Sequence, residues 1–353
     1  MTKKAAIILA GGQAKRFQVK QKQWEDKALA RLFDKPLLIN VIERISDAIE
    51  EIVVCTNDDA RRIQYLEMLH RYSIRNVRVY TDEKLAGIEG PIVGILTGLK
   101  FASADYCIVL PCDVPLIQPA VVDYLFNAIG DSCVATPIWP DGRLESLIMV
   151  CERPMAVKIT GALCELGRRR PDDIIRGVPE VTFVSIIVNL KNLDPEFKSF
   201  VNINLPEDLN LFPTRVVENG PIKENLKLNI GCPDASELKL LKTASKHYHG
   251  GEFLEAANLF SSLSTHLTKR GLSFWAGIAI ENEGKSLFSL SEKQSDTGFK
   301  KDYHTKAKAA FMKAAQNYQL EAETYEKNNI SFLANHARAD GLWCQRIANE
   351  ERS

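Results

Sequence analysis

An apolar run close to the N-terminus is followed by two glycines and then by two basic residues, a combination that suits phosphate binding. Residues 5–10 are apolar, Gly11 and Gly12 follow, and Lys15 and Arg16 come next. Because glycine lacks a Cβ, backbone N–H groups in such a loop can converge on an anion. The pattern predicts a nucleotide phosphate site, although a plain strand-to-loop turn would also contain glycines. Neither G-x-G-x-x-G nor G-x-x-x-x-G-K-[ST] occurs, which excludes a dinucleotide fingerprint and a Walker A loop.

A single carboxylate follows a second apolar run. Asp113 stands directly behind residues 106–111, in the sequence Cys112-Asp113-Val114-Pro115. Open α/β sheets bind ligands at the carboxyl ends of their strands, so Asp113 and the glycine loop are expected at the same edge. Mg²⁺ prefers oxygen ligands that protein and substrate share. We therefore expect Asp113 to hold Mg²⁺ beside a triphosphate; a turn or N-cap role is the alternative.

Two asparagines, Asn202 and Asn204, lie in a third stretch that could carry chemistry. Residues 199–203 are expected to form a strand, on which side chains two positions apart share one face. Pro206, Glu207 and Asp208 follow and are typical of a helix start. The pair could face a ligand or could simply punctuate a turn.

Alternating apolar runs and amphipathic patterns must position these groups. Strands are expected at 5–10, 51–56, 77–81, 106–111, 133–137, 145–151, 182–188 and 199–203, and helices at 36–48, 58–71, 91–103, 118–128, 152–166 and 171–176. This alternation predicts an α/β three-layer sandwich with a mostly parallel sheet over residues 1–212.

The C-terminal third has a different pattern. Prolines and glycines punctuate residues 213–233, which we interpret as a linker. Residues 234–353 are helical, beginning at Asp234, an N-cap candidate with Glu237 three positions later. Residues 250–260 resemble the turn and second helix of a tetratricopeptide hairpin, without a clean 34-residue repeat. A TPR-like helical domain is expected.

Composition limits the function classes. The 353 residues carry a formal net charge of zero, which argues against nucleic-acid binding as the main activity. No apolar stretch approaches the ~20 residues needed to span a bilayer, so no membrane interaction is expected. The eight cysteines form no C-x-x-C pair and mostly lie in apolar runs, as expected of buried thiols in a reducing compartment. A cytoplasmic protein is the expectation.

Taken in order, these motifs resemble a known family. The segments that carry the resemblance are Leu9-Ala10-Gly11-Gly12 with Arg16, Lys27 before Lys35-Pro36-Leu37, Gly90-Pro91, Cys112-Asp113-Val114-Pro115 and residues 201–209. Residues 3–212 are similar to Rossmann-like nucleotidyltransferases of the molybdenum cofactor guanylyltransferase (MobA) family. The resemblance does not extend into the helical region.

The resemblance implies a role for each matching residue. It places the nucleotide at Leu9, Ala10, Gly11, Gly12, Lys27, Asn57, Asp82 and Gly90, the catalytic groups at Arg16, Lys27 and Asp113, Mg²⁺ at Asp113, and the acceptor at Asn202, Asn204 and Arg169.

The sequence departs from the family pattern in two places. The segment from Phe17 to Asp26 is longer than the family's loop and contains no glycine. Lys22 matches the family's spacing from Arg16, whereas Lys27 matches the preceding aspartate and the spacing to Lys35, so Lys27 is preferred. In addition, residues 144–147 lack the family's usual proline.

The activity implied is transfer of GMP from GTP to the phosphate of molybdopterin, with release of pyrophosphate. The alternatives are another NTP transferase, using CTP or a sugar- or alcohol-phosphate, and a nucleotide-sensing scaffold that acts through its helical domain. Residues 234–353 could stabilise the chain, self-associate or bind a protein partner.

Overall fold

The computed structural model describes residues 3–12, 26–85, 87–204, 208 and 219–350. The chain divides into two units. The first consists of Met1–Cys164 and Arg169–Asn229, and the second of Glu165–Arg168 and Ile230–Ser353. Four residues, Glu165–Arg168, therefore belong to the helical second unit although the residues on both sides of them in sequence belong to the first.

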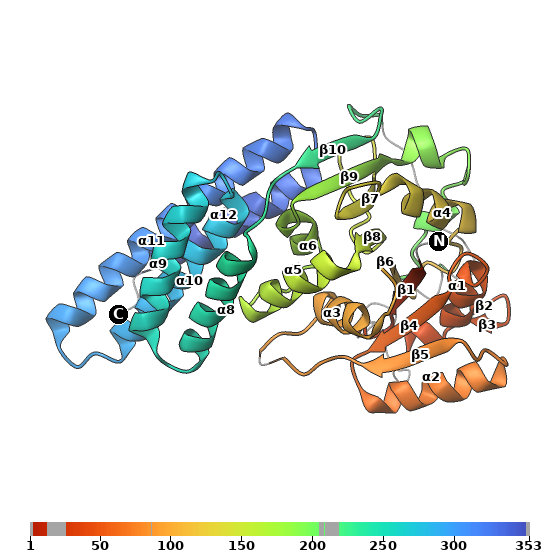
Figure 1. The fold of residues 1–353 in the computed structure, drawn as a ribbon, viewed down its shortest axis with the longest axis horizontal. Helices are drawn as coiled ribbons and strands as arrows, with labels where there is room; N and C mark the ends of the chain where they lie inside the picture. The colour runs from red at the N-terminus through yellow and green to blue at the C-terminus, as the bar shows by residue number, and fades with distance from the viewer. Residues whose placement is uncertain (1–2, 13–25, 86, 205–207, 209–218, 351–353) are drawn as a thin grey trace. The chain divides into compact units, whose positions relative to one another are not determined.

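An eight-stranded sheet forms the centre of the first unit (Figure 1). Its order is β10-β9-β7-β8-β6-β1-β4-β5. The strands are β1 (Lys4–Leu9), β4 (Glu51–Thr56), β5 (Val77–Thr81), β6 (Tyr106–Pro111), β7 (Val134–Ile138), β8 (Met149–Glu152), β9 (Glu180–Ser185) and β10 (Leu226–Asn229). The half that runs β6-β1-β4-β5 is parallel throughout, while β8 and β10 are antiparallel to their neighbours. The predicted mostly parallel α/β sheet is confirmed.

Helices flank this sheet. They are α1 (Leu37–Ile45), α2 (Asp59–Arg71), α3 (Pro91–Phe101), α4 (Pro119–Ala128), α5 (Arg153–Glu165) and α6 (Asp172–Gly177), with a short 3-10 turn, η1 (Lys27–Leu29), before a small hairpin of β2 (Arg31–Leu32) and β3 (Lys35–Pro36). Helix α3 begins with a proline at its first position, where the missing N–H costs no hydrogen bond. Gly98 lets α3 approach β1 so closely that a Cβ there would overlap Ile7.

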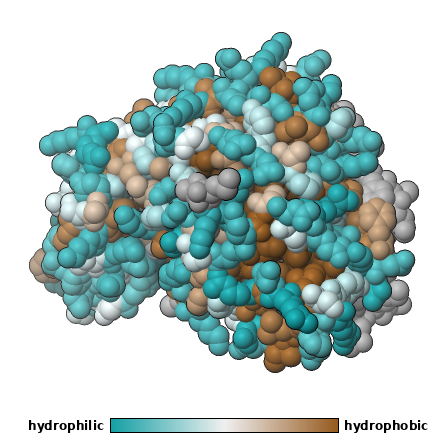
Figure 2. All heavy atoms as spheres, turned by 45° about the vertical axis from the view of Figure 1, so that its right-hand side comes forward, coloured by the Kyte–Doolittle hydropathy of each residue, from teal (hydrophilic) through white to brown (hydrophobic). Residues whose placement is uncertain are grey.

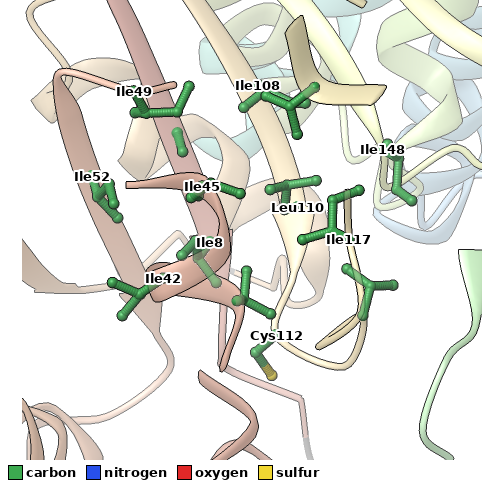
Figure 3. Close-up of a cluster of buried hydrophobic side chains, with 14 of the residues drawn as sticks. Ile8, Ile42, Ile45, Ile49, Ile52, Ile108, Leu110, Cys112, Ile117 and Ile148 are labelled. Atoms are coloured by element: carbon green, nitrogen blue, oxygen red, sulfur yellow. The ribbon is translucent and has the colours of Figure 1, made fainter. Parts of the chain in front are cut away.

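The core of the first unit lies between these helices and the sheet. Figure 3 shows Ile42 and Ile45 of α1 together with Ile8 of β1 and with Ile108 and Leu110 of β6, all fully or almost fully buried. Removing such side chains from water is the main favourable term in folding. On the face drawn in Figure 2, hydrophilic residues predominate and apolar residues gather in patches between them.

Several segments differ from the sequence-based expectation. Residues 199–203 form no strand: Lys198–Phe200 is a 3-10 turn, η3, and residues 201–204 have no regular structure. The cause is local, because the Asp194 carboxylate accepts the N–H groups of Lys198 and Ser199 and so replaces ladder hydrogen bonds. Within the expected linker, Leu226–Asn229 is the edge strand β10. Likewise, β9 ends at Ser185, and Ile186–Leu190 form a π-helical turn, η2.

The second unit is all-helical, as predicted. Its helices are α8 (Ala235–His249), α9 (Phe253–Lys269), α10 (Ser273–Glu292), α11 (Thr297–Lys327) and α12 (Ser331–Asn349), each packed against the next. The predicted capping box of Asp234 and Glu237 is present. Aromatic rings of α11 pack directly against Gly277 and Gly284 of α10, so closely that a Cβ at either glycine would overlap them. In the part of the chain that the structure describes, no helix combines the length and apolar character needed to cross a membrane.

Candidate active site

A cavity of about 820 Å³ lies at the carboxyl edge of the parallel half of the sheet. The residues that follow β1, β4, β5 and β6 border it: Gly11, Asn57, Asp82 and Asp113. Because these four strands are adjacent, their ends bring residues from distant parts of the sequence to one ligand-sized site. Of the residues predicted from sequence, the cavity is lined by Leu9, Ala10, Gly11, Gly12, Lys27, Asn57, Asp82, Gly90, Asp113 and Arg169.

Three predicted residues are not among those that line the cavity. Among the described residues, Asn202 and Asn204 are not part of the cavity lining. Asn204 nevertheless reaches the site, because its Oδ1 accepts a hydrogen bond from Lys27 Nζ at 3.0 Å. Arg16, and the alternative lysine Lys22, lie outside the residues that the structure describes.

A cation and a carboxylate meet where β6 ends. Lys27 Nζ lies 2.5 Å from Asp113 Oδ2, and both side chains are mostly buried. The Asp113 carbonyl also accepts the backbone N–H of Ile203 at 2.9 Å, which brings the segment of Asn204 to this point. In a partly desolvated site such charges interact more strongly than on an open surface. Lys27 can thus contact an incoming phosphate, and the Asp113 carboxylate can bind the cation that accompanies it.

A buried network behind the glycine loop positions Lys27. Tyr65 of α2 donates to Asp26 Oδ2 at 2.6 Å and lies 2.9 Å from the Ala10 carbonyl oxygen. Asp26 Oδ1 in turn accepts the N–H of Ala28 and caps η1, so Lys27 is held at the start of a fixed turn. Burial, reinforced by the neighbouring Asp26, raises the pKa of Tyr65 well above its ordinary value and keeps the hydroxyl protonated as a donor.

Arg61 adds a second link from α2. Its Nη1 donates to the Gly12 carbonyl at 3.2 Å and to Asn57 Oδ1 at 3.1 Å, and its Nε lies 3.4 Å from Asp26 Oδ2. Sequence reasoning missed both Arg61 and Tyr65. The available signal was their spacing: positions four apart lie on one face of a helix, and α2 is otherwise a polar, weakly amphipathic helix.

Asp82 is an unusual carboxylate at the opposite side of the cavity. Its Oδ1 is buried and has no hydrogen-bond partner among the described residues. Burial raises the pKa of Asp82 to about 7. Gly11 and Gly94 leave room around it, since a Cβ at either position would lie 3.4–3.5 Å from a carboxylate oxygen. A buried acceptor without a donor is costly, so this oxygen is suited to a ligand that donates a hydrogen bond.

Arg169 binds the loop that forms another wall. Its Nη2 donates to the Gly87 carbonyl at 2.6 Å, between Asp82 and Gly90. Gly87 and Gly90 both have positive φ, at 72° and 113°, which other residues rarely adopt.

The donor set of the site suits one kind of metal. Among the described residues no three histidine, cysteine, aspartate or glutamate side chains gather into a metal-binding group. Mg²⁺ needs less from the protein, because it keeps water and takes substrate phosphates as ligands besides one or two carboxylates. A carboxylate at the end of β6, Asp113, therefore fits Mg²⁺ that arrives with a nucleotide, and the described residues offer no group of ligands of the kind that holds zinc.

The N-terminal part of the chain is similar to known proteins. Residues 6–180 match the family model described as a MobA-like NTP transferase domain. A probable molybdenum cofactor guanylyltransferase of Methanosarcina mazei is 28% identical over 206 residues, which cover 58% of this chain and 88% of that protein. The molybdenum cofactor guanylyltransferase of Shewanella woodyi is 27% identical over 202 residues, 57% of this chain and 91% of that protein.

A solved structure is also similar to this chain. It is the molybdopterin-guanine dinucleotide biosynthesis protein A of Archaeoglobus fulgidus, which is 25% identical. The match covers 58% of this chain and 94% of that one, with a TM-score of 0.46.

Proposed function

We propose that this protein, a nucleotidyltransferase whose residues 6–180 match the MobA-like NTP transferase domain, transfers GMP from GTP to the phosphate of molybdopterin. An oxygen of the acceptor phosphate attacks the α-phosphorus, the bond between that phosphorus and the bridging oxygen breaks, and pyrophosphate leaves. The acceptor oxygen is already ionised, so the reaction needs positioning and charge neutralisation more than a general base.

The observation that carries the proposal is the placement of two different polar centres along one cavity. Asp82 follows β5 and Asp113 follows β6, three strand spacings away in the sheet. At about 4.8 Å per spacing the two carboxylates are separated by roughly 14 Å, which suits a nucleoside at one end and its phosphates at the other.

At the phosphate end of the cavity, Lys27 would contact the phosphates and Asp113 would hold the metal ion. The Lys27 ammonium, 2.5 Å from Asp113, would turn to the phosphate oxygens and neutralise charge that develops on the leaving pyrophosphate. Asp113 would hold Mg²⁺, which supplies further charge neutralisation when bound. Asn204 Oδ1, 3.0 Å from Lys27 Nζ, would keep that ammonium in position.

At the nucleoside end, Asp82 favours guanine. Guanine presents the N1–H and the 2-amino group side by side as donors, and an ionised carboxylate can only accept. Binding of such a ligand would give the buried Oδ1 the partner that it lacks within the described residues.

Pyrophosphate release tests the proposal. The wild-type protein is incubated with GTP, CTP, ATP or UTP, each with and without molybdopterin and Mg²⁺. We expect release only with GTP and molybdopterin together, and its loss in Asp113→Ala with an unchanged circular dichroism spectrum. Asp47→Ala, at an exposed residue that does not line the cavity, is the matched control.

Other outcomes would contradict the proposal in distinct ways. Release with CTP and a sugar- or alcohol-phosphate would indicate a different transferase. Nucleotide binding without release under any condition would favour a sensing role. Full Mg²⁺-dependent activity of Asp113→Ala would refute the metal assignment.

A further inference from the structure

Helix α3 runs beside the segment that follows β5 and contains Asp82. The helix packs against β1, β4 and β5 (Figure 1). Gly94, Thr97 and Lys100 follow one another on it at intervals of three, so they lie along one face. Each of them approaches Asp82 or Glu83, the two cavity residues that come directly after β5. One face of α3 thus borders the nucleoside end of the site.

Thr97 contributes a buried acceptor to this segment. Its Oγ1 accepts the N–H of Glu83 at 3.0 Å, and its side chain is fully buried. It is the one polar side chain in the stretch Ile92–Leu99, where the other residues are apolar or glycine. A polar group in such surroundings costs free energy unless it is hydrogen-bonded, and the branched Cβ of threonine restricts rotation about χ1. The acceptor is therefore fixed in space and determines where the Glu83 N–H lies.

The backbone of Asp82 is held on both sides. Its own N–H donates to the carbonyl of Thr56, the last residue of β4, at 2.7 Å, and the N–H of the next residue is the one that Thr97 accepts. The Asp82 Oδ1 has no hydrogen-bond partner among the described residues. Because no such partner fixes this oxygen, its direction depends on the backbone that the two hydrogen bonds hold.

Two glycines limit where the carboxylate can lie. A Cβ at Gly94 would be 3.4 and 3.5 Å from the two carboxylate oxygens of Asp82, and a Cβ at Gly11 would be 3.5 Å from Oδ2. The carboxylate therefore lies between two stretches of backbone, where a small shift of the Asp82 main chain would change its direction.

Lys100 contacts the same segment through an ion pair. It donates to both carboxylate oxygens of Glu83, at 2.9 and 2.7 Å, and so neutralises the acid next to Asp82. Both members of the pair are partly exposed, so we expect it to contribute less than the bond to the buried Thr97.

We propose that Thr97 is a positioning residue that determines base specificity, because its bond to the Glu83 N–H aims the Asp82 carboxylate at the donor edge of guanine. Thr97 is not among the described residues that line the cavity, so it acts through Asp82 and not by touching the nucleotide. The inference rests on the proposed function and adds to it the residue that makes Asp82 selective. GTP affinity should then depend on Thr97 only while Asp82 can accept from guanine.

A double-mutant cycle on the full chain tests this dependence. Thr97→Val keeps the shape of the side chain and removes the acceptor, Asp82→Ala removes the carboxylate, and a third variant combines both. Thr160→Val is the matched control, because Thr160 is also a fully buried helical threonine of the first unit but lies outside the cavity lining that the structure describes. Isothermal titration calorimetry with Mg²⁺ and without acceptor gives the Kd of GTP and of inosine triphosphate (ITP), whose base lacks the 2-amino group. Pyrophosphate release at saturating GTP gives kcat.

We expect Thr97→Val to raise the Kd of GTP about three- to tenfold, the range that one lost hydrogen bond supports, and to raise that of ITP less. The preference for GTP over ITP should fall accordingly. In the Asp82→Ala background the same substitution should change the Kd of GTP less than about twofold. The kcat should be nearly unchanged, because Lys27 and Asp113 at the phosphate end are not altered. Thr160→Val should match wild type in every measurement.

Two further variants separate a positioning role from a structural one. Thr97→Ser keeps the hydroxyl acceptor and should bind GTP within about twofold of wild type. Lys100→Met removes only the partly exposed ion pair and should raise the Kd less than Thr97→Val does. If Thr97→Val does not fold, Thr97→Ala takes its place in the cycle, since the space left beside Glu83 admits a water that can accept the N–H.

Two results would overturn the inference: an unchanged GTP Kd in Thr97→Val, or an equal rise of Kd with and without the Asp82 carboxylate. The second result would show that Thr97 acts on the fold in general. The proposed function fails on different measurements, which need no Thr97 variant. If wild type binds GTP and ITP alike and Asp82→Ala leaves the GTP Kd unchanged, the guanine assignment of Asp82 is refuted, and the inference with it.

Discussion

Replacing Asp82 with Asn should stabilise the first unit at alkaline pH while weakening nucleotide binding. Burial raises the pKa of Asp82 to about 7 in the folded protein, compared with about 3.9 for an aspartate in an unfolded chain. Between these values the folded state binds a proton that the unfolded state has lost. The free energy of unfolding of wild type therefore falls as pH rises from about 4 to 7, and levels off above. Asparagine does not titrate and shows no such fall.

The size of the effect follows from the difference of about 3 pH units. At 1.36 kcal/mol per unit, the ceiling is about 4 kcal/mol at pH 8, and solvent contact of the partly exposed side chain reduces it to about 1–3 kcal/mol. At pH 4 the two proteins should be nearly equal in stability, and at pH 5 the difference should be about a third of its value at pH 8. Guanine donors select the ionised carboxylate, so the affinity of wild type for GTP should rise from pH 6 to pH 8, and Asp82→Asn should lose that dependence.

Amide hydrogen exchange in β1 and β4 measures the opening free energy of the first unit without contribution from the helical unit. It would be recorded for wild type and Asp82→Asn at pH 5 and pH 8, after correction for the intrinsic exchange rate. Asp47→Asn, at an exposed position, is the control and should match wild type at both values. A stability difference that is absent at pH 8, or equal at both values, would refute the assignment of a buried, titrating Asp82.

Three further predictions concern the site and its support. Lys27→Ala should lower kcat/KM for pyrophosphate release far more than Lys22→Ala, and the reverse order would move the phosphate lysine to Lys22. Tyr65→Phe removes the donor that two buried acceptors share, so urea unfolding should show a loss of about 1–3 kcal/mol; unchanged stability would argue against the network. Gly98→Ala should also cost about 1–3 kcal/mol through overpacking against β1. By contrast, Gly12→Ala should not destabilise the protein, because no described atom lies within 4 Å of a Cβ there.

The sheet and the principal site residues were predictable from the sequence for a physical reason. Buried parallel strands are continuous apolar runs, and their carboxyl ends share one edge, so the positions of Gly11 and Asp113 behind such runs were enough to expect them at one site. Asp82, which also lines the cavity, was expected there only through the family resemblance. The helices of the second unit were also predictable, because their apolar residues recur at helical spacing over long segments. The N-cap residue Asp234 also marks where the first of them begins.

The parts that sequence could not predict depend on contacts between distant residues. Nothing in the types of Arg61 and Tyr65 reveals that they hold the glycine loop and Asp26, since α2 displays them among other polar residues. The asparagine segment looked like a strand because residues 199–203 include phenylalanine, valine and isoleucine, which favour strands. Hydrogen bonds from its backbone to Asp194 override that pattern, and the residue types alone give no sign of them.

The two outermost strands of the sheet bear on how the protein avoids aggregation. At β5, Arg62 Nε donates a hydrogen bond to the Val79 carbonyl at 3.2 Å, and the Arg78 guanidinium lies beside Glu51. On β10, only four residues long, Lys227 pairs with Glu180 at 2.8 Å. Charged side chains and short length are the means by which edge strands discourage pairing with another chain. A sheet of eight strands can therefore remain open at both ends while its borders resist the strand addition that begins fibril growth.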